Sequence, residues 1–301
     1  MRIIKLVVFG LVFLCFSALL KAQDQKDSSN LAREELKFIE HLINSKEHTD
    51  ALFLIKGIHK KFPDNYFTEQ INDSLNYLAA WSLYNQKKLD SSIVYFEKVS
   101  KNSTVYLKSK FYETFEWIYL RKPLNAENLI SKIDTKNDSL FLELAKMDLS
   151  ICALLKKDYK RFDSISNIFL YNNVQFSEEQ KELIAYKKEL QKVKKKSPVV
   201  AAGLSALVPG LGKYYAGYRG QAMATFLPSA IFGVVAAENL YRRGPKDVQF
   251  ILFASIFSIF YAGNIWGSAI SVRTYREQQY NEIYNNIMLD LHIPLRRIFS
   301  E

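Results

Sequence analysis

The chain has 301 residues, of which 49% are hydrophobic and 14% aromatic, and its formal net charge is +10. It holds 11 Gly and 7 Pro, and most of them lie in the C-terminal third. An all-β fold needs turn residues at intervals of about ten positions. The composition therefore excludes that class, and we predict an all-α chain with long helices before residue 197.

The first residues read MRIIKLVVFGLVFLCFSALLKAQ. Arg2 and Lys5 precede an apolar run over 6–20, and small residues follow near Ala22. This order is typical of a secretory signal peptide. We predict a signal peptide over 1–22, with an uncleaved membrane anchor as the alternative, and export of everything that follows.

The positive charge lies in the C-terminal part of the chain. Residues 23–191 carry 25 basic and 25 acidic side chains, whereas residues 192–301 carry 13 and 6. An exported, neutral soluble part is not a nucleic-acid binder, and basic residues beside apolar segments favour lipid head groups. After the signal peptide only Cys152 remains, so no intrachain disulfide can form, and its apolar neighbours predict a buried thiol.

Apolar residues recur at helical spacing over 31–170, in pairs of helices joined by short polar turns. In residues 78–103, Leu89, Ser92 and Phe96 resemble the tetratricopeptide repeat family, in which a small residue permits close contact within a helix pair. The resemblance implies stacked helical hairpins that bind a protein or peptide along a concave face. A generic helical bundle is the alternative. Further matches are Ala51 and Pro63 in the preceding unit, and Ala126 and Tyr159 in the later ones.

Residues 177–196 predict a helix that closes the exported domain over 23–196. Ser177 is an N-cap candidate, acidic residues follow it, and lysines end the segment. We expect the lysines to meet lipid head groups, with a solvated charge run as the alternative. They are Lys192, Lys194, Lys195 and Lys196.

A membrane domain is predicted over 197–275. Residues 198–212 are apolar but too short to cross a bilayer, so we predict a re-entrant or interfacial segment. Two segments of adequate length follow, at 220–240 and 248–272, and the short link between them predicts an antiparallel hairpin. Residues 276–301 predict an amphipathic C-terminal tail that lies along the membrane.

The segment PGLGKYYAG, residues 209–217, turns the chain into the bilayer. Its glycines permit tight backbone turns, and its tyrosines suit the head-group level. It resembles the opening of small bacterial two-helix membrane domains, including the TM-two type and related uncharacterised domains, over about 198–275. The residues of this predicted membrane turn are Pro209, Gly210, Gly212, Tyr214, Tyr215, Gly217 and Gly220, with Tyr218 beside them.

Small residues at four-residue spacing predict close helix packing in both spans, within one hairpin or between copies. Asn264 and Glu238 are polar residues within or near the spans. They are functional candidates by default, and a hydrogen bond across the hairpin or a place near the interface is the simpler explanation. The predicted packing residues are Ser229, Gly233 and Ala237 in the first span, and Ala254, Ser258, Ala262, Gly263 and Gly267 in the second.

No pattern of a catalytic or metal site is present. The four histidines, His41, His48, His59 and His292, are scattered, and no phosphate loop or nucleophile elbow occurs. Glu113 and Glu116 lie among aromatic residues. We interpret them as the solvated edge of a helix, with an acidic pair in a groove as the alternative. No cofactor is expected.

These features predict a membrane-anchored periplasmic scaffold that binds a protein partner along its helical array, in the bilayer of a bacterial inner membrane. It would serve as an envelope or membrane-protein assembly factor. If 198–212 does not cross the bilayer, Arg242, Arg243 and Lys246 lie in the cytoplasm, as the positive-inside rule prefers. The alternative is an oligomeric pore or transport component built from the hairpin, a homo-oligomer with the array as its collar. An enzyme using Glu113 and Glu116 is the third hypothesis.

Overall fold

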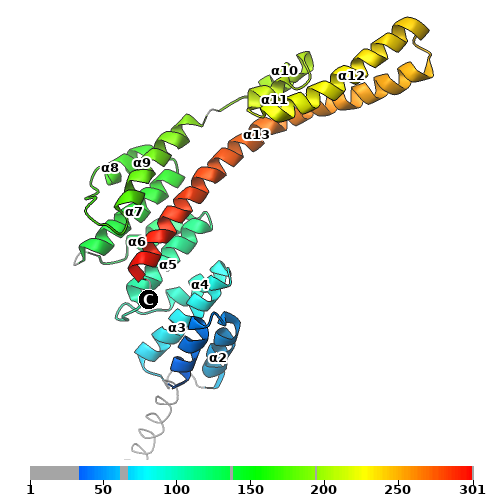
Figure 1. Cartoon of the computed structure of the whole chain (residues 1–301). Helices are drawn as coiled ribbons and strands as arrows, with labels where there is room; N and C mark the ends of the chain where they lie inside the picture. Colours follow the sequence, from blue (N-terminus) through cyan, green and yellow to red (C-terminus); the bar gives the residue numbers. More distant parts are fainter. Residues whose placement is uncertain (1–33, 62–66, 136–137, 194, 300–301) are drawn as a thin grey trace, which may run out of the picture. The chain divides into compact units, whose positions relative to one another are not determined.

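A computed structural model describes residues 34–61, 67–135, 138–193 and 195–299 (Figure 1). These residues form helices, turns and irregular segments, and no strand occurs among them, so the predicted all-α class is confirmed. The predicted signal peptide, Pro63 and Lys194 lie outside the described residues.

The chain divides into two compact units. Unit 1 is formed by Met1–Gln180 together with Asp290–Glu301, and unit 2 is formed by Lys181–Leu289. Unit 1 therefore includes a C-terminal segment that begins more than one hundred residues after Gln180.

Unit 1 begins, in its described part, with a helix over 34–44, and each following helix packs mainly against its neighbours in the chain. This nearest-neighbour packing puts helices that are consecutive in the sequence side by side (Figure 1). The helices are α2 (His48–Lys61), α3 (Glu69–Asn85), α4 (Leu89–Glu97), α5 (Tyr106–Tyr119), α6 (Pro123–Ile130), α7 (Ser139–Leu155) and α8 (Tyr159–Ser166).

The same turn joins the two helices of four successive pairs in the described part of unit 1. A basic residue with φ between 59° and 64° ends each first helix, at Lys46, Lys87, Arg121 and Lys157, at intervals of 41, 34 and 36 residues. At Lys87, its amide donates to the Tyr84 carbonyl at 2.9 Å, and the next amide donates to the Leu83 carbonyl at 3.0 Å. A positive φ is uncommon outside glycine, and a cation there also suits the negative end of the helix dipole.

Small residues permit the close contact within these pairs. The Ser92 hydroxyl on α4 donates to the Ala80 carbonyl on α3 at 2.8 Å. Ala51 and Ala126 stand at the equivalent position, five residues after the turn residue, and both are fully buried. In the last pair the fully buried Phe162 stands at this position instead. The small residue of the repeat pattern is therefore missing from the sequence of that pair.

Unit 2 holds the later helices. They are α9 (Ser177–Lys192), which begins in unit 1, α10 (Pro198–Leu207), α11 (Leu211–Ala216), α12 (Arg219–Arg243) and α13 (Val248–Phe299). The chain leaves the helical conformation between α10 and α11, at the Pro209–Gly210 step that the sequence predicts as a break. Among the described residues, α12 and α13 are the two helices long and apolar enough to cross a membrane.

The predicted C-terminal tail is not a separate element. Helix α13 runs from Val248 to Phe299, and no glycine or proline over 268–293 ends it where the span was predicted to end. Its apolar residues Ile283, Ile287 and Leu291, each four positions after the last, are all buried. The last turns of α13, from Asp290, belong to unit 1.

Candidate functional site

The C-terminal end of α13 lies on a face formed by the first helices of three pairs, α3, α5 and α7. The His292 Nε2 and the Tyr84 hydroxyl of α3 are 2.6 Å apart, and the His292 ring stacks on Phe115 of α5 with centroids 5.0 Å apart. Phe299 stacks on Phe141 of α7 at 5.7 Å. We call this surface the first-helix face.

Apolar and ionic contacts hold the same segment. Leu291 and Leu295, one helical turn apart, have no exposed surface. The Arg297 guanidinium donates to the Glu179 carboxylate at 2.8 Å and to the Gln175 carbonyl at 2.9 Å. Burial of these leucines supplies most of the free energy that holds the segment on unit 1. The half-exposed ion pair between Arg297 and Glu179 contributes little free energy and orients the segment.

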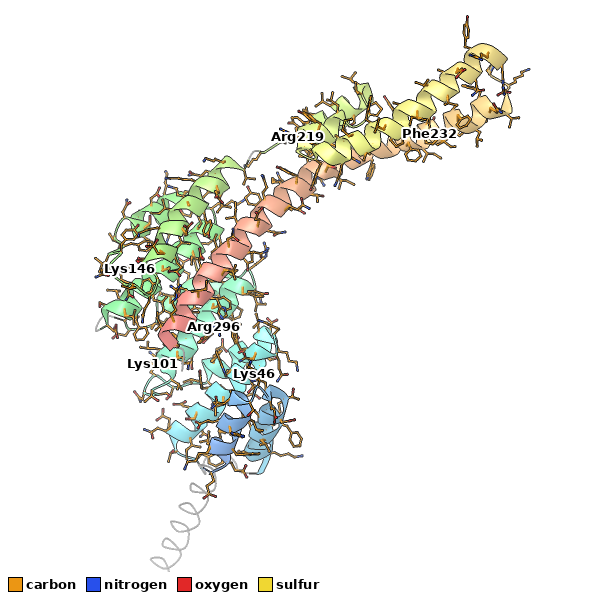
Figure 2. The ribbon with its side chains drawn as sticks, in the orientation of Figure 1. Lys46, Lys101, Lys146, Arg219, Phe232 and Arg296 are labelled. Atoms are coloured by element: carbon orange, nitrogen blue, oxygen red, sulfur yellow. The ribbon has the colours of Figure 1, made fainter. Side chains whose placement is uncertain are left out.

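A cavity of about 450 Å³ lies beside the α13 segment on the first-helix face. Sites for small ligands or side chains commonly have a volume of about 300–1,000 Å³ and aromatic walls. The Lys108 ammonium lies over the rings of Tyr77 and Trp81, 5.4 and 5.8 Å from their centroids. Figure 2 labels Arg296, which contributes a second cation from α13. The lining residues are Glu40, Ile43, Asn44, Ser74, Tyr77, Leu78, Trp81, Val105, Lys108, Tyr112, Arg296 and Phe299.

Sequence reasoning missed this cavity. Its one local signal is the pair Tyr77 and Trp81, four residues apart on α3, whose rings stack with centroids 6.4 Å apart. Nothing in the local pattern indicates that Arg296 and Phe299 complete the wall, because they are more than two hundred residues away.

Glu113 and Glu116 are not a solvated edge, so that interpretation is wrong. Both are buried in α5, and neither lines the cavity. Glu113 forms an ion pair with the buried Lys110 at 2.8 Å, and Lys110 also donates to the Phe96 carbonyl at 2.9 Å. Burial raises the pKa of Glu113, and the Lys110 charge opposes that rise.

Burial raises the pKa of Glu116 to about 8. Neither oxygen of its carboxyl group has a hydrogen-bond partner among the described residues. Ser92 lies close enough to act on this group, but its single hydroxyl hydrogen goes to the Ala80 carbonyl. Glu116 is therefore a neutral acid at pH 7, a structural group within the core.

Asp148 is a second buried acid, on α7. Its carboxyl oxygens have no hydrogen-bond partner among the described residues, and burial raises its pKa well above the ordinary value. Cys152 lies one helical turn later, and burial raises the pKa of its thiol. The thiol is buried, as its apolar neighbours predict, and a raised pKa makes it unreactive.

Glycines of the predicted membrane turn are required by close backbone contacts. A Cβ at Gly212 would lie 2.0 Å from the Ala201 carbonyl oxygen, and one at Gly210, where φ is +87°, would lie 2.4 Å from the Ala222 oxygen. Gly217 has φ +121° and faces the Tyr275 ring. Gly220 has open space around it, so the same restriction does not apply there.

Side chains of the turn bind other parts of unit 2. The Tyr215 hydroxyl accepts from the Ser197 amide at 3.2 Å, and the Tyr218 hydroxyl donates to Gln278 at 2.5 Å. Tyr214 is exposed. The Ser205 hydroxyl accepts from the Gly212 amide at 2.9 Å and lies 2.7 Å from the Ser268 hydroxyl, which ties α10 and α11 to α13.

Lys196 has a role that the sequence does not predict. Its ammonium donates to the carbonyls of Tyr215 and Ala216, at 2.6 and 3.1 Å, and so caps the C-terminus of α11. It also lies over the Tyr275 ring. Lys192 and Lys195 are exposed, so the prediction that they meet lipid head groups still stands.

Aromatic residues form much of the contact between α12 and α13. Phe232, labelled in Figure 2, stacks on Phe253 and Phe260 with centroids 6.4 and 5.6 Å apart. Gly233 faces the Phe257 ring, 3.1 Å from where its Cβ would lie. Figure 1 shows α12 and the beginning of α13 running side by side in opposite directions.

Only some of the predicted packing residues lie at this contact. Ser229 is buried, but Ala237 is exposed, with its neighbour Ala236 buried instead. On α13, Ser258, Ala262 and Gly263 are exposed, Ala254 is half-buried, and Gly267 lies beside the Lys213 side chain. The buried Asn264 has no hydrogen-bond partner among the described residues, and Glu238 pairs with Arg242 at 3.1 Å.

In the part of the chain that the structure describes, no group of three or more His, Cys, Asp or Glu side chains could hold a metal ion. Among the histidines, His292 contacts the aromatic side chains of Tyr84 and Phe115. No protein-family model, curated protein or solved structure matches the chain.

Proposed function

We propose that the protein is an exported, membrane-anchored scaffold whose helical array binds a protein partner, as an envelope or membrane-protein assembly factor does. The observation that carries this proposal is the first-helix face, which holds a helical segment and retains a cavity of about 450 Å³ beside it. A surface that already accommodates a helix has the shape and the aromatic side chains for helix-in-groove recognition.

The array is of the tetratricopeptide-repeat type in this proposal. Support comes from the four helix pairs with the same turn at Lys46, Lys87, Arg121 and Lys157, and from the small residues at their contacts. Pairs of helices that stack on their chain neighbours form one continuous face from their first helices. The proposed binding surface is that face.

The hairpin of α12 and the first half of α13 is the membrane anchor. Apolar side chains of both helices are largely exposed, among them Val234, Ile259 and Trp266, and only 17% and 6% of their apolar windows are buried. The core helix of a soluble protein would be mostly buried. Insertion of both helices into a lipid bilayer would remove this apolar surface from water.

The end of α13 supports a topology. Residues 290–299 contact α3, α5 and α7, so the C-terminus lies on the same side of the membrane as the array. The chain between them must then cross an even number of times, which α12 and α13 satisfy if 198–212 does not cross. Export places the array in the periplasm of a bacterial inner membrane and the basic residues around 242–246 in the cytoplasm.

Single cysteines at Lys101, Leu289 and Lys246, all exposed positions, test this topology. We expect a membrane-impermeant thiol reagent added to intact spheroplasts to label Lys101→Cys and Leu289→Cys. Lys246→Cys should react only after the membrane is opened. Labelling of Lys246→Cys in intact spheroplasts would contradict the topology, and the chain without any substitution is the control for Cys152.

The partner is tested by crosslinked affinity purification of the full chain from membranes. Trp81→Ala with Lys108→Glu changes the cavity, and we expect it to reduce recovery of a stoichiometric partner at least tenfold, since a buried Trp anchor is commonly worth about 2 kcal/mol or more. The matched control is Val94→Ala with Lys101→Glu, at exposed positions outside the cavity. Equal recovery from both variants would exclude the first-helix face as the binding surface.

The same purification tests the pore or transport component. Its support is the exposed run of Ser258, Ala262 and Gly263 on α13, which α12 leaves uncovered and which would let helices of different copies meet. Recovery of the chain alone, as a stable homo-oligomer, would favour this function over the scaffold.

A further inference from the structure

We infer that residues 290–299 of α13 are an exchangeable ligand of the array, and that the partner presents an amphipathic helix of the same pattern, which binds by replacing this segment. The inference rests on the proposed function, and it names the class of partner that the first-helix face accepts.

The contacts of the segment define what the face recognises. Leu291 and Leu295 are fully buried and Phe299 joins the aromatic side chains of α5 and α7, so the face takes apolar residues at positions i, i+4 and i+8. His292, at i+1, pairs with the Tyr84 hydroxyl. Arg297, at i+6, pairs with the buried Glu179. A partner helix with this pattern would satisfy the same groups.

Two features make the segment replaceable. Pro294 has no N–H to donate to the carbonyl of Asp290, so α13 lacks a backbone hydrogen bond at the point where it enters unit 1. The segment also fills the face incompletely, because the cavity of about 450 Å³ lies beside Arg296 and Phe299. A longer or bulkier partner helix would bury the exposed parts of Trp81 and Lys108 as well.

The test uses the full chain in detergent and a fluorescent peptide of residues 286–299 as the probe. Leu291→Asp with Leu295→Asp in the protein releases its own segment. We expect this opened chain to bind the peptide with a Kd of about 1–10 μM and the unsubstituted chain at least tenfold more weakly, because a tethered segment has a local concentration of the order of millimolar. The peptide carrying both Asp substitutions should not bind.

The matched control is Leu289→Asp with Ile293→Asp, which places the same charges on more exposed positions of the same helix. It should behave as the unsubstituted chain does. An opened chain that unfolds cooperatively on heating and yet does not bind the peptide would overturn the inference, because the segment would then be a fixed part of the fold.

Hydrogen exchange of the unsubstituted chain provides a measurement that needs no variant. We expect amides of 290–299 to exchange at least tenfold faster than those of α5, since a replaceable segment opens on its own. Equal rates would overturn the inference, and so would light scattering that shows a second copy held through this segment. If the inference fails in this way but the Trp81→Ala, Lys108→Glu variant still loses its partner, the proposed scaffold function remains supported.

Discussion

Replacing Glu116 with Gln is expected to leave stability nearly unchanged at pH 5 and to raise it by about 4 kcal/mol at pH 8.5. The folded pKa of about 8 exceeds the ordinary 4.5 of an exposed Glu. Between these values the folded chain keeps a proton that the unfolded chain has released. Stability is therefore lost as pH rises from 4.5 to 8, by up to about 1.4 kcal/mol per pH unit from this group, and Gln removes that loss.

The measurement is the thermal midpoint of the full chain at pH 5 and pH 8.5, followed by tryptophan fluorescence. The difference between the variant and the unsubstituted chain isolates Glu116, because all other buried acids, Glu113 and Asp148 among them, are present in both. A difference that does not depend on pH would contradict the assignment of Glu116 as a neutral acid.

Glu113→Gln is the matched control on the same helix, and its expected effect has the opposite sign at pH 7. The substitution leaves the buried Lys110 ammonium without its carboxylate partner, which costs about 1–3 kcal/mol when an amide oxygen remains to accept a hydrogen bond. Burial raises the pKa of Glu113 too, but the close Lys110 contact decides the sign. Unchanged function in both variants would also exclude the enzyme hypothesis.

Gly212→Ala is expected to destabilise unit 2 by about 3 kcal/mol or more. The added Cβ would lie 2.0 Å from the Ala201 carbonyl oxygen and 2.6 Å from the Ser205 hydroxyl. Helix α11 must then move away from α10, which also breaks the hydrogen bond from the Gly212 amide to Ser205. The measurement is hydrogen exchange of the α10 and α11 amides in detergent as the temperature is raised. It gives the thermal midpoint of unit 2.

Gly220→Ala belongs to the same motif and is the control for that experiment. Nothing lies within 4 Å of the position of its Cβ, and Gly220 is already helical in α12. Alanine favours a helix over glycine by about 0.5–1 kcal/mol, so a slight gain in stability is expected. Equal destabilisation by both substitutions would show that the close α10–α11 contact is not the cause.

The sequence identifies local features well. The first long apolar helix agrees to within a few residues, with 220–240 predicted against Arg219–Arg243. The second begins at 248 as predicted, but it continues to Phe299, well past the predicted end at 272. The break near Pro209 and the start of α9 at Ser177 also agree. These features depend on the helical period, on caps and on glycine, which act over one or two turns.

The sequence does not reveal which distant side chains meet. Glu116 is buried because other helices cover it, and Ser92 of α4 and Tyr84 of α3 lie near its carboxyl group. On an isolated helix the same residue would form part of a solvated polar edge. Lys196 shows the same effect on a smaller scale, because its bonds to Tyr215 and Ala216 require α11 to fold back on the chain.

The sequence by itself determined the all-α class, the two long apolar helices and the need for glycine in the turn that precedes the first of them. Tertiary structure alone decided that α13 is one helix reaching unit 1, where His292 meets Tyr84 across 208 residues. It also decided that Arg296 and Phe299 complete a cavity with α3 and α5. The physical reason is that the hydrophobic effect has no direction. The apolar face of Leu291 and Leu295 predicts that these side chains are buried, but it does not identify the helices that bury them.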